Sequence, residues 1–220
     1  MSAQHALTET TMTELREQAK SYFTDSMSPA HDWYHVERVE TLAERLLDHY
    51  ENADERTVSL AVLLHDIGRT REDSGQIDDH AAWGAREART LLREHGIGKE
   101  RVEAVCHAVA THRYSTGKEP DSLEAKLLSD ADNLDALGAV GVARCFTYGG
   151  ERGQVIYDPT VPPEADDSAA GQSQYNHFHK KILGLPERMY TDAGRQIADD
   201  RVAFVETFLD RFDRELIGEV

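Results

Sequence analysis

Histidine and aspartate residues at several points of this sequence have the types and spacing of metal ligands. His65 and Asp66 are adjacent, and they follow a mostly apolar run from Val58 to Leu64. An ionised carboxylate at the buried end of such a segment is unfavourable unless it is paired or coordinates a metal. The alternative is a solvated helix end, with both side chains in water. Further ligands elsewhere in the chain decide between these two interpretations.

His35 is a second candidate, because it lies on the inward-facing stripe of a predicted helix. It precedes Val39, Leu42 and Leu46 at steps of four, three and four residues, which is the spacing of one helical face. A core histidine that only bonds a carbonyl group would show the same spacing. The pattern therefore predicts that His35 is buried, and it leaves the role of the imidazole open.

An acidic run beyond the middle of the chain offers further carboxylates, namely Asp130, Asp132 and Asp135. Asp130 is in phase with the leucines of this segment, but phase is a poor guide in a helix that is buried on all sides. Periodicity therefore does not choose between Asp130 and Asp132. Imidazole and carboxylate ligands together suit Mn, Fe, Co, Ni or Zn better than Ca, which prefers oxygen alone. Inward ligands on several helices are typical of metal sites in bundle cores.

Most of the chain has helical periodicity, and we expect an all-α fold. The helices are predicted over residues 11–26, 31–50, 54–67, 80–95, 99–112, 123–146, 177–190 and 191–216. Residues 69–79 and 113–120 are predicted to connect helices, and Gly68 to end the third helix. Three prolines and four glycines in residues 149–176 predict a long loop or lid. We find no convincing domain boundary in residues 1–220, whose core would span about residues 28–146.

The charge of the chain limits its partners. Asp and Glu number 41 against 24 Lys and Arg, for a net charge of −17, and only six of the basic residues are lysines. The negative electrostatic potential of such a protein repels polyanions, which argues against sequence-specific binding of nucleic acid. The apolar periodicity argues against a disordered acidic chain. We therefore interpret the acidity as a surface adapted to concentrated salt, as in a halophile.

The sequence contains no pattern that predicts a membrane segment, a secretory signal or a disulfide framework. No apolar run approaches the roughly 18 residues of a membrane helix, and the first residues are polar and helix-like. Cys106 and Cys145 are the only cysteines, and they form no Cys-x-x-Cys motif of the kind that binds zinc. A cytoplasmic protein is the expectation.

Three segments that contain the candidate ligands resemble the HD-domain metal-dependent phosphohydrolases. These are HDWYHVERV (31–39), LLHDI (63–67) and DADNLDA (130–136), in the order His, His-Asp, Asp. Further segments resemble the small microbial HD proteins that act on nucleotides, namely GAVGVAR (138–144), YGG (148–150), YDP (157–159) and NHFHK (176–180). The similarity covers about residues 28–215. A lone His-Asp pair is a weak signal, whereas the three spaced segments together are specific.

The resemblance implies a set of metal ligands. His35, His65, Asp66 and Asp132 match the ligand positions of the family, which favours Asp132 over Asp130. His80 and His112 occur where some HD phosphodiesterases supply ligands for a second metal, and the alternative is that they lie at the surface or contact substrate. Mn²⁺ is the expected cation, with Co²⁺, Ni²⁺, Fe²⁺ or Zn²⁺ as alternatives.

The implied activity is hydrolysis of a nucleotide phosphoanhydride or phosphoester by a metal-activated water. Asp66 would help to accept the proton of that water, and Glu72 and Asp73 are weaker candidates for a base. The alternatives are a phosphodiesterase, an alarmone hydrolase, or a regulatory HD protein without catalysis. We find no synthetase domain that would support the alarmone alternative, and the intact ligand set argues against the regulatory one.

A phosphorylated substrate needs local positive charge in so acidic a protein. His31 and Arg69 adjoin the ligand segments and are assigned catalytic roles beside Asp66. Candidate phosphate-binding residues are Lys180, Lys181, His177, Lys126 and Arg144. The alternative for the lysines is a solvated surface position, which is the usual one. We expect a monomer or homodimer acting on a small nucleotide.

Overall fold

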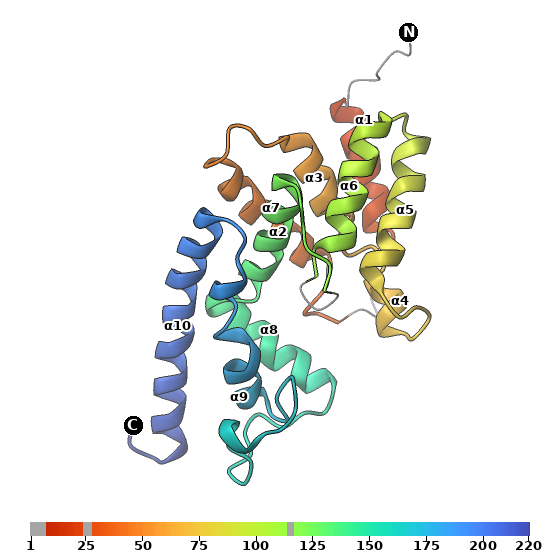
Figure 1. The fold of residues 1–220 in the computed structure, drawn as a ribbon. Helices are drawn as coiled ribbons and strands as arrows, with labels where there is room; N and C mark the ends of the chain where they lie inside the picture. Colours follow the sequence, from red (N-terminus) through yellow and green to blue (C-terminus); the bar gives the residue numbers. More distant parts are fainter. Residues whose placement is uncertain (1–7, 24–27, 114–116) are drawn as a thin grey trace. The chain divides into compact units, whose positions relative to one another are not determined.

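The computed structural model describes residues 8–23, 28–113 and 117–220, and within these ranges it is helical without any strand (Figure 1). The all-α prediction is therefore confirmed. The chain divides into two compact units. The first contains residues 31–132 together with the N-terminal helix, and the second contains residues 28–30 and 133–220.

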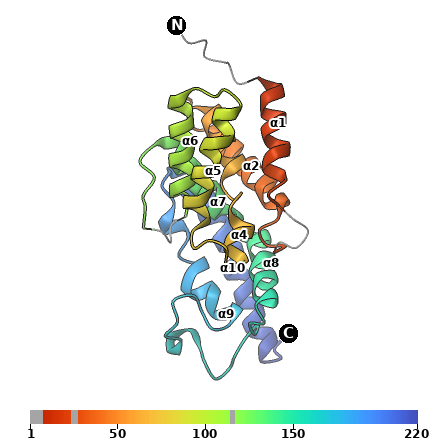
Figure 2. The same cartoon turned by 90° about the vertical axis from the view of Figure 1, so that its right-hand side faces the viewer.

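The first unit is built around a central helix, α3 (Glu55–Leu64). Its other helices are α1 (Glu9–Lys20), α2 (Trp33–Leu47), α4 (Arg69–Asp73), α5 (His80–Glu94), α6 (Lys99–Thr111) and most of α7 (Leu123–Asp135). Helices α1, α2, α5 and α6 all contact α3, and α5 and α6 run side by side in both ribbon views (Figure 2). Because α3 is surrounded, the residues that follow it enter the interior of the unit.

Aspartate side chains cap the helices of this unit and so determine where they begin. Asp32 accepts from the backbone N–H of His35, and Asp79 accepts from that of Ala82. Such caps satisfy N–H groups that have no partner within the helix, at a gain of about 1 kcal/mol each. The cap at Asp79 makes His80 the first residue of α5.

Gly68 allows a close approach between two segments of the first unit. A methyl group at this position would lie 2.7 Å from the carbonyl oxygen of His80 and 3.1 Å from the Trp83 ring. No real side chain tolerates a backbone contact of that length, so only glycine lets the turn after Asp66 pack on the start of α5. The predicted end of the third helix was wrong, because α3 ends at Leu64 and Gly68 is the N-cap of α4; the sequence did not predict the contact with His80 either.

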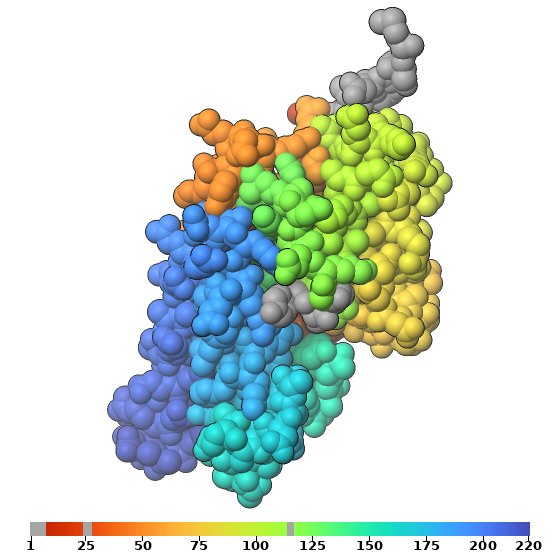
Figure 3. Space-filling view, in the orientation of Figure 1, coloured from red at the N-terminus to blue at the C-terminus, as the bar shows by residue number. Residues whose placement is uncertain are grey.

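Helices α5 and α6 form a closely packed pair in the first unit. On the face shown in Figure 3, α5 and α6 lie next to each other at the right, with the segment that leads into α7 beside α6. The sides of α5 and α6 that face the core carry small or branched apolar residues such as Ala88, Val105 and Val109. These short side chains let the two helices pack closely.

The second unit consists of a helical pair and a loop. Its elements are α8 (Gly138–Glu151), the 3₁₀ turn η2 (Pro163–Ala165), α9 (Gln174–His177), the π turn η3 (Phe178–Ile182), the 3₁₀ turn η4 (Pro186–Arg188) and α10 (Asp192–Leu216). Helices α8 and α10 pack together. Phe146 of α8 lies 6.0 Å from Phe208 of α10, and 5.6 Å from Phe178, between ring centroids. These rings form an aromatic cluster in which Phe178 is fully buried.

The loop before α9 is held by one carboxylate. Asp166 accepts hydrogen bonds from the backbone N–H and hydroxyl of Ser168, from Gln172 N–H and from the Asn176 amide, at 2.6–2.9 Å. A side chain that accepts so many donors acts as an internal cap for irregular backbone. The predicted loop thus has a defined structure, and it begins after Glu151.

Several predicted helix bounds were wrong. The expected helix 123–146 is two helices, because Gly138 takes φ +70°, a conformation that ends a regular helix. The expected helix 177–190 is replaced by α9 and the short turns before Pro186. Helix α4 occurs in a predicted connection. Helix α1 ends at Lys20, and residues 24–26 of the expected first helix lie outside the described residues.

Among the helices that the structure describes, none combines the length and the apolar character that crossing a membrane requires.

Candidate metal centre

Six side chains of the first unit bring potential ligand atoms together, and we call them the ligand cluster. They come from α2, the turn after α3, the start of α5, the end of α6 and α7: His35, His65, Asp66, His80, His112 and Asp132. All except Asp132 are buried, and the side chain of Asp132 is 25% exposed. A buried set of imidazoles and carboxylates is costly to form unless it binds a cation or is internally paired.

The first ligand group of the cluster consists of His35, His65 and Asp132. Nε2 of His35 lies 3.3 Å from Asp132 Oδ1 and 3.3 Å from His65 Nε2. One ligand atom from each of the three residues lies within 4.8 Å of the others. Asp130 is buried on the same helix, but Asp132 is the aspartate beside His35.

The second ligand group consists of Asp66, His80 and His112. Asp66 Oδ1 lies 3.0 Å from His80 Nε2 and 3.8 Å from His112 Nε2, and the two histidine nitrogens are 3.3 Å apart. His80 and His112 are therefore interior residues, and the alternative of surface histidines was wrong.

Asp66 contacts both groups through different oxygens. Its Oδ1 faces the second group, while its Oδ2 lies 3.7 Å from Nε2 of His35 and 3.7 Å from Nε2 of His65. This arrangement suits a carboxylate that bridges two cations, because each oxygen has its own set of neighbouring nitrogens.

The hydrogen bonds of the histidines test whether a cation fits. Nδ1 of His65 donates to the Val62 carbonyl at 2.7 Å, and Nδ1 of His112 donates to the Val109 carbonyl at 2.7 Å. In the neutral rings, the lone pairs are then on the Nε2 atoms, which face the Asp66 carboxylate. The Nε2 lone pairs and the carboxylate oxygens are all hydrogen-bond acceptors and repel one another. A cation bound between them would remove this repulsion. The donor set therefore fits a divalent transition metal.

Electrostatics hold both carboxylates of the cluster in the ionised form. Burial alone would raise the pKa of Asp66, but His65, His80 and His35 lower it well below its usual range. Burial acts in the same way on Asp132, where the hydrogen bond and charge of His35 lower the pKa. Ionised carboxylates at neutral pH are the form that binds metals.

The histidines of the second group differ in basicity. Burial, with the nearby His65 and His80, lowers the pKa of His112 to about 4. Burial would also lower the pKa of His80, but the charge and hydrogen bond of Asp66 raise it overall. His112 is thus neutral and available as a ligand at neutral pH, whereas His80 holds a proton more tightly when no cation neutralises Asp66.

Two side chains outside the predicted ligand set, Glu72 and Arg113, fix the position of the His80 ring. Glu72 Oε2 lies 2.7 Å from His80 Nδ1, and Arg113 donates to Glu72 Oε1 at 2.8 Å. From the sequence, Glu72 is only a weak candidate base, and no role is predicted for Arg113. Glu72 precedes His80 by eight residues, and the two residues lie on different helices. Helical periodicity does not extend across the intervening turn, so the sequence contained no signal for this contact.

Other predicted site residues of the first unit lie around the cluster with different contacts. The His31 ring packs edge-on against the His35 ring at 5.9 Å. Arg69 donates to Asp73 at 3.2 Å and lies 3.6 Å from Glu72. Lys126 is partly exposed on α7. The roles assigned to these three residues stay predictions.

The remaining predicted phosphate-binding residues belong to the second unit. Arg144 donates to Asp135 at 2.8 Å and to the Ala30 carbonyl at 2.9 Å, so it has structural partners there. Nδ1 of His177 donates a hydrogen bond to the Ala170 carbonyl oxygen at 2.5 Å. Lys180 and Lys181 are exposed. Their contacts with a substrate stay predictions.

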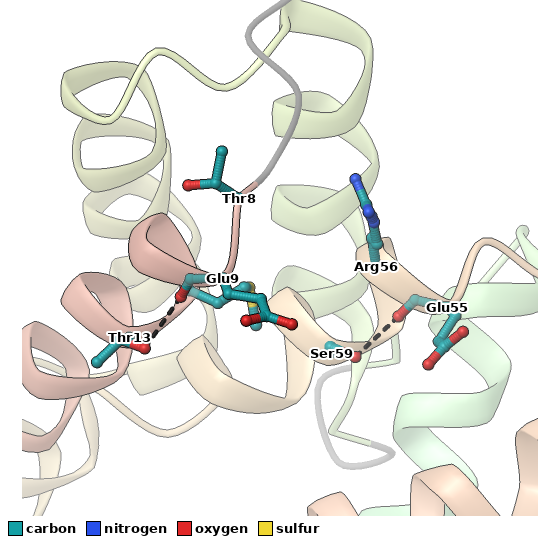
Figure 4. Close-up of a pocket in the computed structure, with 7 residues that line it drawn as sticks. Thr8, Glu9, Thr13, Glu55, Arg56 and Ser59 are labelled. Atoms are coloured by element: carbon teal, nitrogen blue, oxygen red, sulfur yellow. Dashed lines mark hydrogen bonds between the residues drawn. The ribbon is translucent and has the colours of Figure 1, made fainter.

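A surface hollow of about 430 Å³ lies elsewhere on the first unit, between the starts of α1 and α3 (Figure 4). It is lined by Thr8, Glu9, Met12, Thr13, Glu55, Arg56 and Ser59. None of these residues belongs to the ligand cluster. Within the hollow, the hydroxyls of Thr13 and Ser59 donate to carbonyls of their own helices, so they are not convergent binding groups.

Comparison with known proteins supports the geometric assignment. The sequence profile of the HD domain matches residues 32–137, which include the whole ligand cluster. YpgQ of Bacillus subtilis is 34% identical over 209 residues, which cover 93% of each protein. The chain belongs to the HD-domain family. The resemblance inferred from the three spaced segments is thereby confirmed.

Solved structures of HD proteins have the same fold. An HD-superfamily hydrolase from Bacillus thuringiensis has a TM-score of 0.74 and 33% identity, with 96% of this chain and 98% of that chain covered. YpgQ of B. subtilis, solved in complex with ADP, has a TM-score of 0.74 and 32% identity, with 95% and 96% covered. HD domains bind divalent metals, and the ligand cluster has the residues to do so.

A more distant HD relative is a nuclease. The 3'-5' exoribonuclease YhaM of B. subtilis is 29% identical over 117 residues, which are 47% of this chain and 37% of that protein. The similarity therefore spans only part of each chain.

Proposed function

We propose that this protein is a divalent-metal-dependent phosphohydrolase that cleaves a phosphoanhydride or phosphoester of a nucleotide. The observation that carries the proposal is the position of Asp66, with one oxygen toward His35 and His65 and the other toward His80. A carboxylate surrounded by imidazole nitrogens in this way would be suited to hold divalent cations.

We propose two cation positions, one in each ligand group. His35, His65, Asp66 and Asp132 would hold the first, and Asp66, His80 and His112 the second. Mn²⁺ is the proposed ion, and Co²⁺, Ni²⁺, Fe²⁺ or Zn²⁺ would also suit a set that mixes imidazole with carboxylate. When bound, such cations acidify a water and withdraw charge from the phosphorus atom.

The residues of the chain would contribute orientation and proton transfer. The Asp66 carboxylate is proposed to accept a proton from the attacking water as the bond to the leaving oxygen of the phosphate breaks. His31 and Arg69 are proposed to stabilise the negative charge that develops on the phosphoryl oxygens. Lys126, Arg144, His177, Lys180 and Lys181 are proposed to bind substrate phosphates.

A nucleotide is the proposed substrate for two reasons. YpgQ, whose sequence and fold are similar over nearly the whole chain, was solved in complex with ADP. The net charge of −17 disfavours binding of long polyanions, whereas a small phosphate bound next to divalent cations avoids most of that repulsion.

A phosphodiesterase is the second candidate function, and the partial similarity to YhaM supports it. The same two ligand groups would serve diester hydrolysis, because the attack of water on phosphorus needs the same charge stabilisation. An alarmone hydrolase or a regulatory HD protein without catalysis has less support. A cytoplasmic location, a single functional domain and a monomeric or homodimeric state are also proposals.

The deciding experiment is a substrate screen of the purified, Mn²⁺-loaded protein in high salt. Nucleoside di- and triphosphates, alarmones, short RNA and a generic diester would be compared by release of phosphate, pyrophosphate or mononucleotide. Faster turnover of nucleoside phosphates supports the proposal, and faster turnover of RNA or the diester supports the second candidate. Metal binding without turnover of any substrate would contradict both.

A further inference from the structure

His80 is oriented differently from its neighbours in the ligand cluster. His65 and His112 follow the last residues of α3 and α6, and each donates Nδ1 to the carbonyl three residues earlier. His80 is the first residue of α5, so no turn of its own helix precedes it. Its ring therefore needs a partner from another segment to fix the orientation in which Nε2 faces Asp66.

Glu72 of α4 is that partner. Its Oε2 lies 2.7 Å from His80 Nδ1, and the Glu72 side chain is only 18% exposed. Arg113, at the end of the α6 segment, donates to Oε1 of the same carboxylate at 2.8 Å. Gly68 also brings α4 and the start of α5 into contact. The Glu72 carboxylate thus contacts the His80 ring through one oxygen and Arg113 through the other, at a point where Gly68 lets the two segments approach closely.

We propose that Glu72 is the positioning residue of the second ligand group and controls whether a second cation is bound. This inference rests on the proposed two-cation centre and assigns separate control to one of its positions. In the neutral His80 ring that donates Nδ1–H to Glu72, the lone pair is on Nε2, the atom that lies 3.0 Å from Asp66 Oδ1 and 3.3 Å from His112 Nε2. A carboxylate behind a ligating imidazole fixes its tautomer and increases its basicity.

The effect is selective because the first ligand group is oriented by other contacts. Nδ1 of His65 is held by the Val62 carbonyl, and the His31 ring packs edge-on against the His35 ring at 5.9 Å. Loss of such a supporting carboxylate typically reduces metal affinity about 10- to 100-fold. We expect a loss of this size at the second position, with the first position retaining its affinity.

The test is Mn²⁺ titration of the metal-free full chain, for the unchanged protein and for Glu72→Gln. Calorimetry gives the number of ions and their affinities, and electron paramagnetic resonance detects the coupled signal of a paired Mn²⁺ centre. We expect two ions and a coupled signal in the unchanged protein. In Glu72→Gln we expect one ion with unchanged affinity, a second bound about 10- to 100-fold more weakly, and loss of the coupled signal at equal Mn²⁺.

Glu87→Gln is the matched control, because Glu87 is a partly buried glutamate on α5 that accepts a hydrogen bond from Tyr22 at 2.6 Å. It should bind both ions normally. If Glu72→Gln does not fold, as judged by circular dichroism, Arg113→Met replaces it and should weaken the second ion in the same direction.

Two outcomes would overturn the inference. One is a Glu72→Gln protein that binds both ions with the affinities of the unchanged protein. The other is an unchanged protein that binds a single ion at saturation. If that single ion supports nucleotide hydrolysis, the proposed function stands and only the role of Glu72 is lost. Two ions without hydrolysis of any substrate would instead contradict the proposed function.

Discussion

Asp66 Oδ1 lies 3.0 Å from Nε2 of His80. Asp66 lies in the turn between α3 and α4, and His80 is the first residue of α5. The opposite oxygen of the same carboxylate faces His35 and His65. One side chain thus joins the two halves of the ligand cluster, and the predictions below follow from that arrangement and from the contacts that support it.

Replacement of Asp66 should abolish hydrolysis. We expect Asp66→Ala to lower kcat by about 100- to 10,000-fold, the range for loss of a proton-transfer group, and to weaken both cations. Steady-state kinetics and Mn²⁺ titration measure the two effects. Asp48→Asn, at an exposed helix end, is the control and should behave normally. Substantial turnover by Asp66→Ala would disprove the mechanism.

A methyl group on Gly68 should separate α4 from the start of α5. Because that methyl would lie 2.7 Å from the His80 carbonyl oxygen, Gly68→Ala should lower the free energy of unfolding by about 1–3 kcal/mol and weaken the second cation. Gly98→Ala meets nothing within 4 Å and should cost less than about 1 kcal/mol. Urea denaturation compares the two variants, and equal stabilities would show that the close contact is unimportant.

The lysine pair of the second unit should act on substrate affinity and leave the chemical step intact. We expect the double variant Lys180→Ala, Lys181→Ala to raise KM about fivefold, which corresponds to about 1 kcal/mol, with little change in kcat. Lys118→Ala removes another exposed lysine and is the control. A KM equal to that of the unchanged enzyme would assign both lysines to the solvated surface.

Acid should weaken the loop before α9 through Asp166. Hydrogen bonds from Ser168, Asn176 and Gln172 lower the pKa of Asp166 from its ordinary value of 3.8. A carboxylate with a lowered pKa stabilises the folded state above its ordinary pKa, and that contribution is lost as the pH falls through the folded-state pKa. Between about pH 5 and pH 2, the unchanged protein should therefore lose stability more steeply than Asp166→Asn.

Urea midpoints measured across this pH range test the Asp166 prediction. Asp166→Asn should already be less stable at pH 5, because its amide nitrogen cannot accept the same donors. Asp167→Asn is the neighbouring control, at an exposed position, and should follow the unchanged protein. Parallel pH profiles for Asp166→Asn and the unchanged protein would contradict the prediction.

Salt should stabilise the whole chain. With a net charge of −17, the folded protein concentrates like charges, and screening lowers their repulsion over a Debye length of about 10 Å at 0.1 M and 3 Å at 1 M salt. We expect the thermal midpoint to rise steadily between 0.1 and 2 M KCl. A flat response would show that neighbouring basic residues already balance the acidic ones.

The helical fold and most of the ligand cluster could be predicted from the sequence. Apolar spacing placed His35 on an inward face, and the further candidate ligands favoured a buried Asp66 over a solvated helix end. The order of the three segments then predicted the family. These features are local, because the spacing of residues along a helix determines which of them lie on the same face.

Periodicity could not choose between Asp130 and Asp132, since α7 is buried around much of its circumference. Asp130 is indeed buried, yet Asp132 lies beside His35. Which of two aspartates meets a given histidine depends on how α7 crosses α2 and on side-chain rotamers, and neither is encoded in residue spacing.

The sequence by itself determined that the chain is all-helical, acidic and equipped with histidines and aspartates in the HD order. Only the tertiary structure decided that Asp66 faces two ligand groups, that Glu72 and Arg113 support His80, and that Gly138 divides one expected helix into two. The physical reason is that ligand convergence is a property of helices packed against one another. The contact between Glu72 and His80, for example, depends on how the segment between α4 and α5 folds back, which residue spacing does not specify.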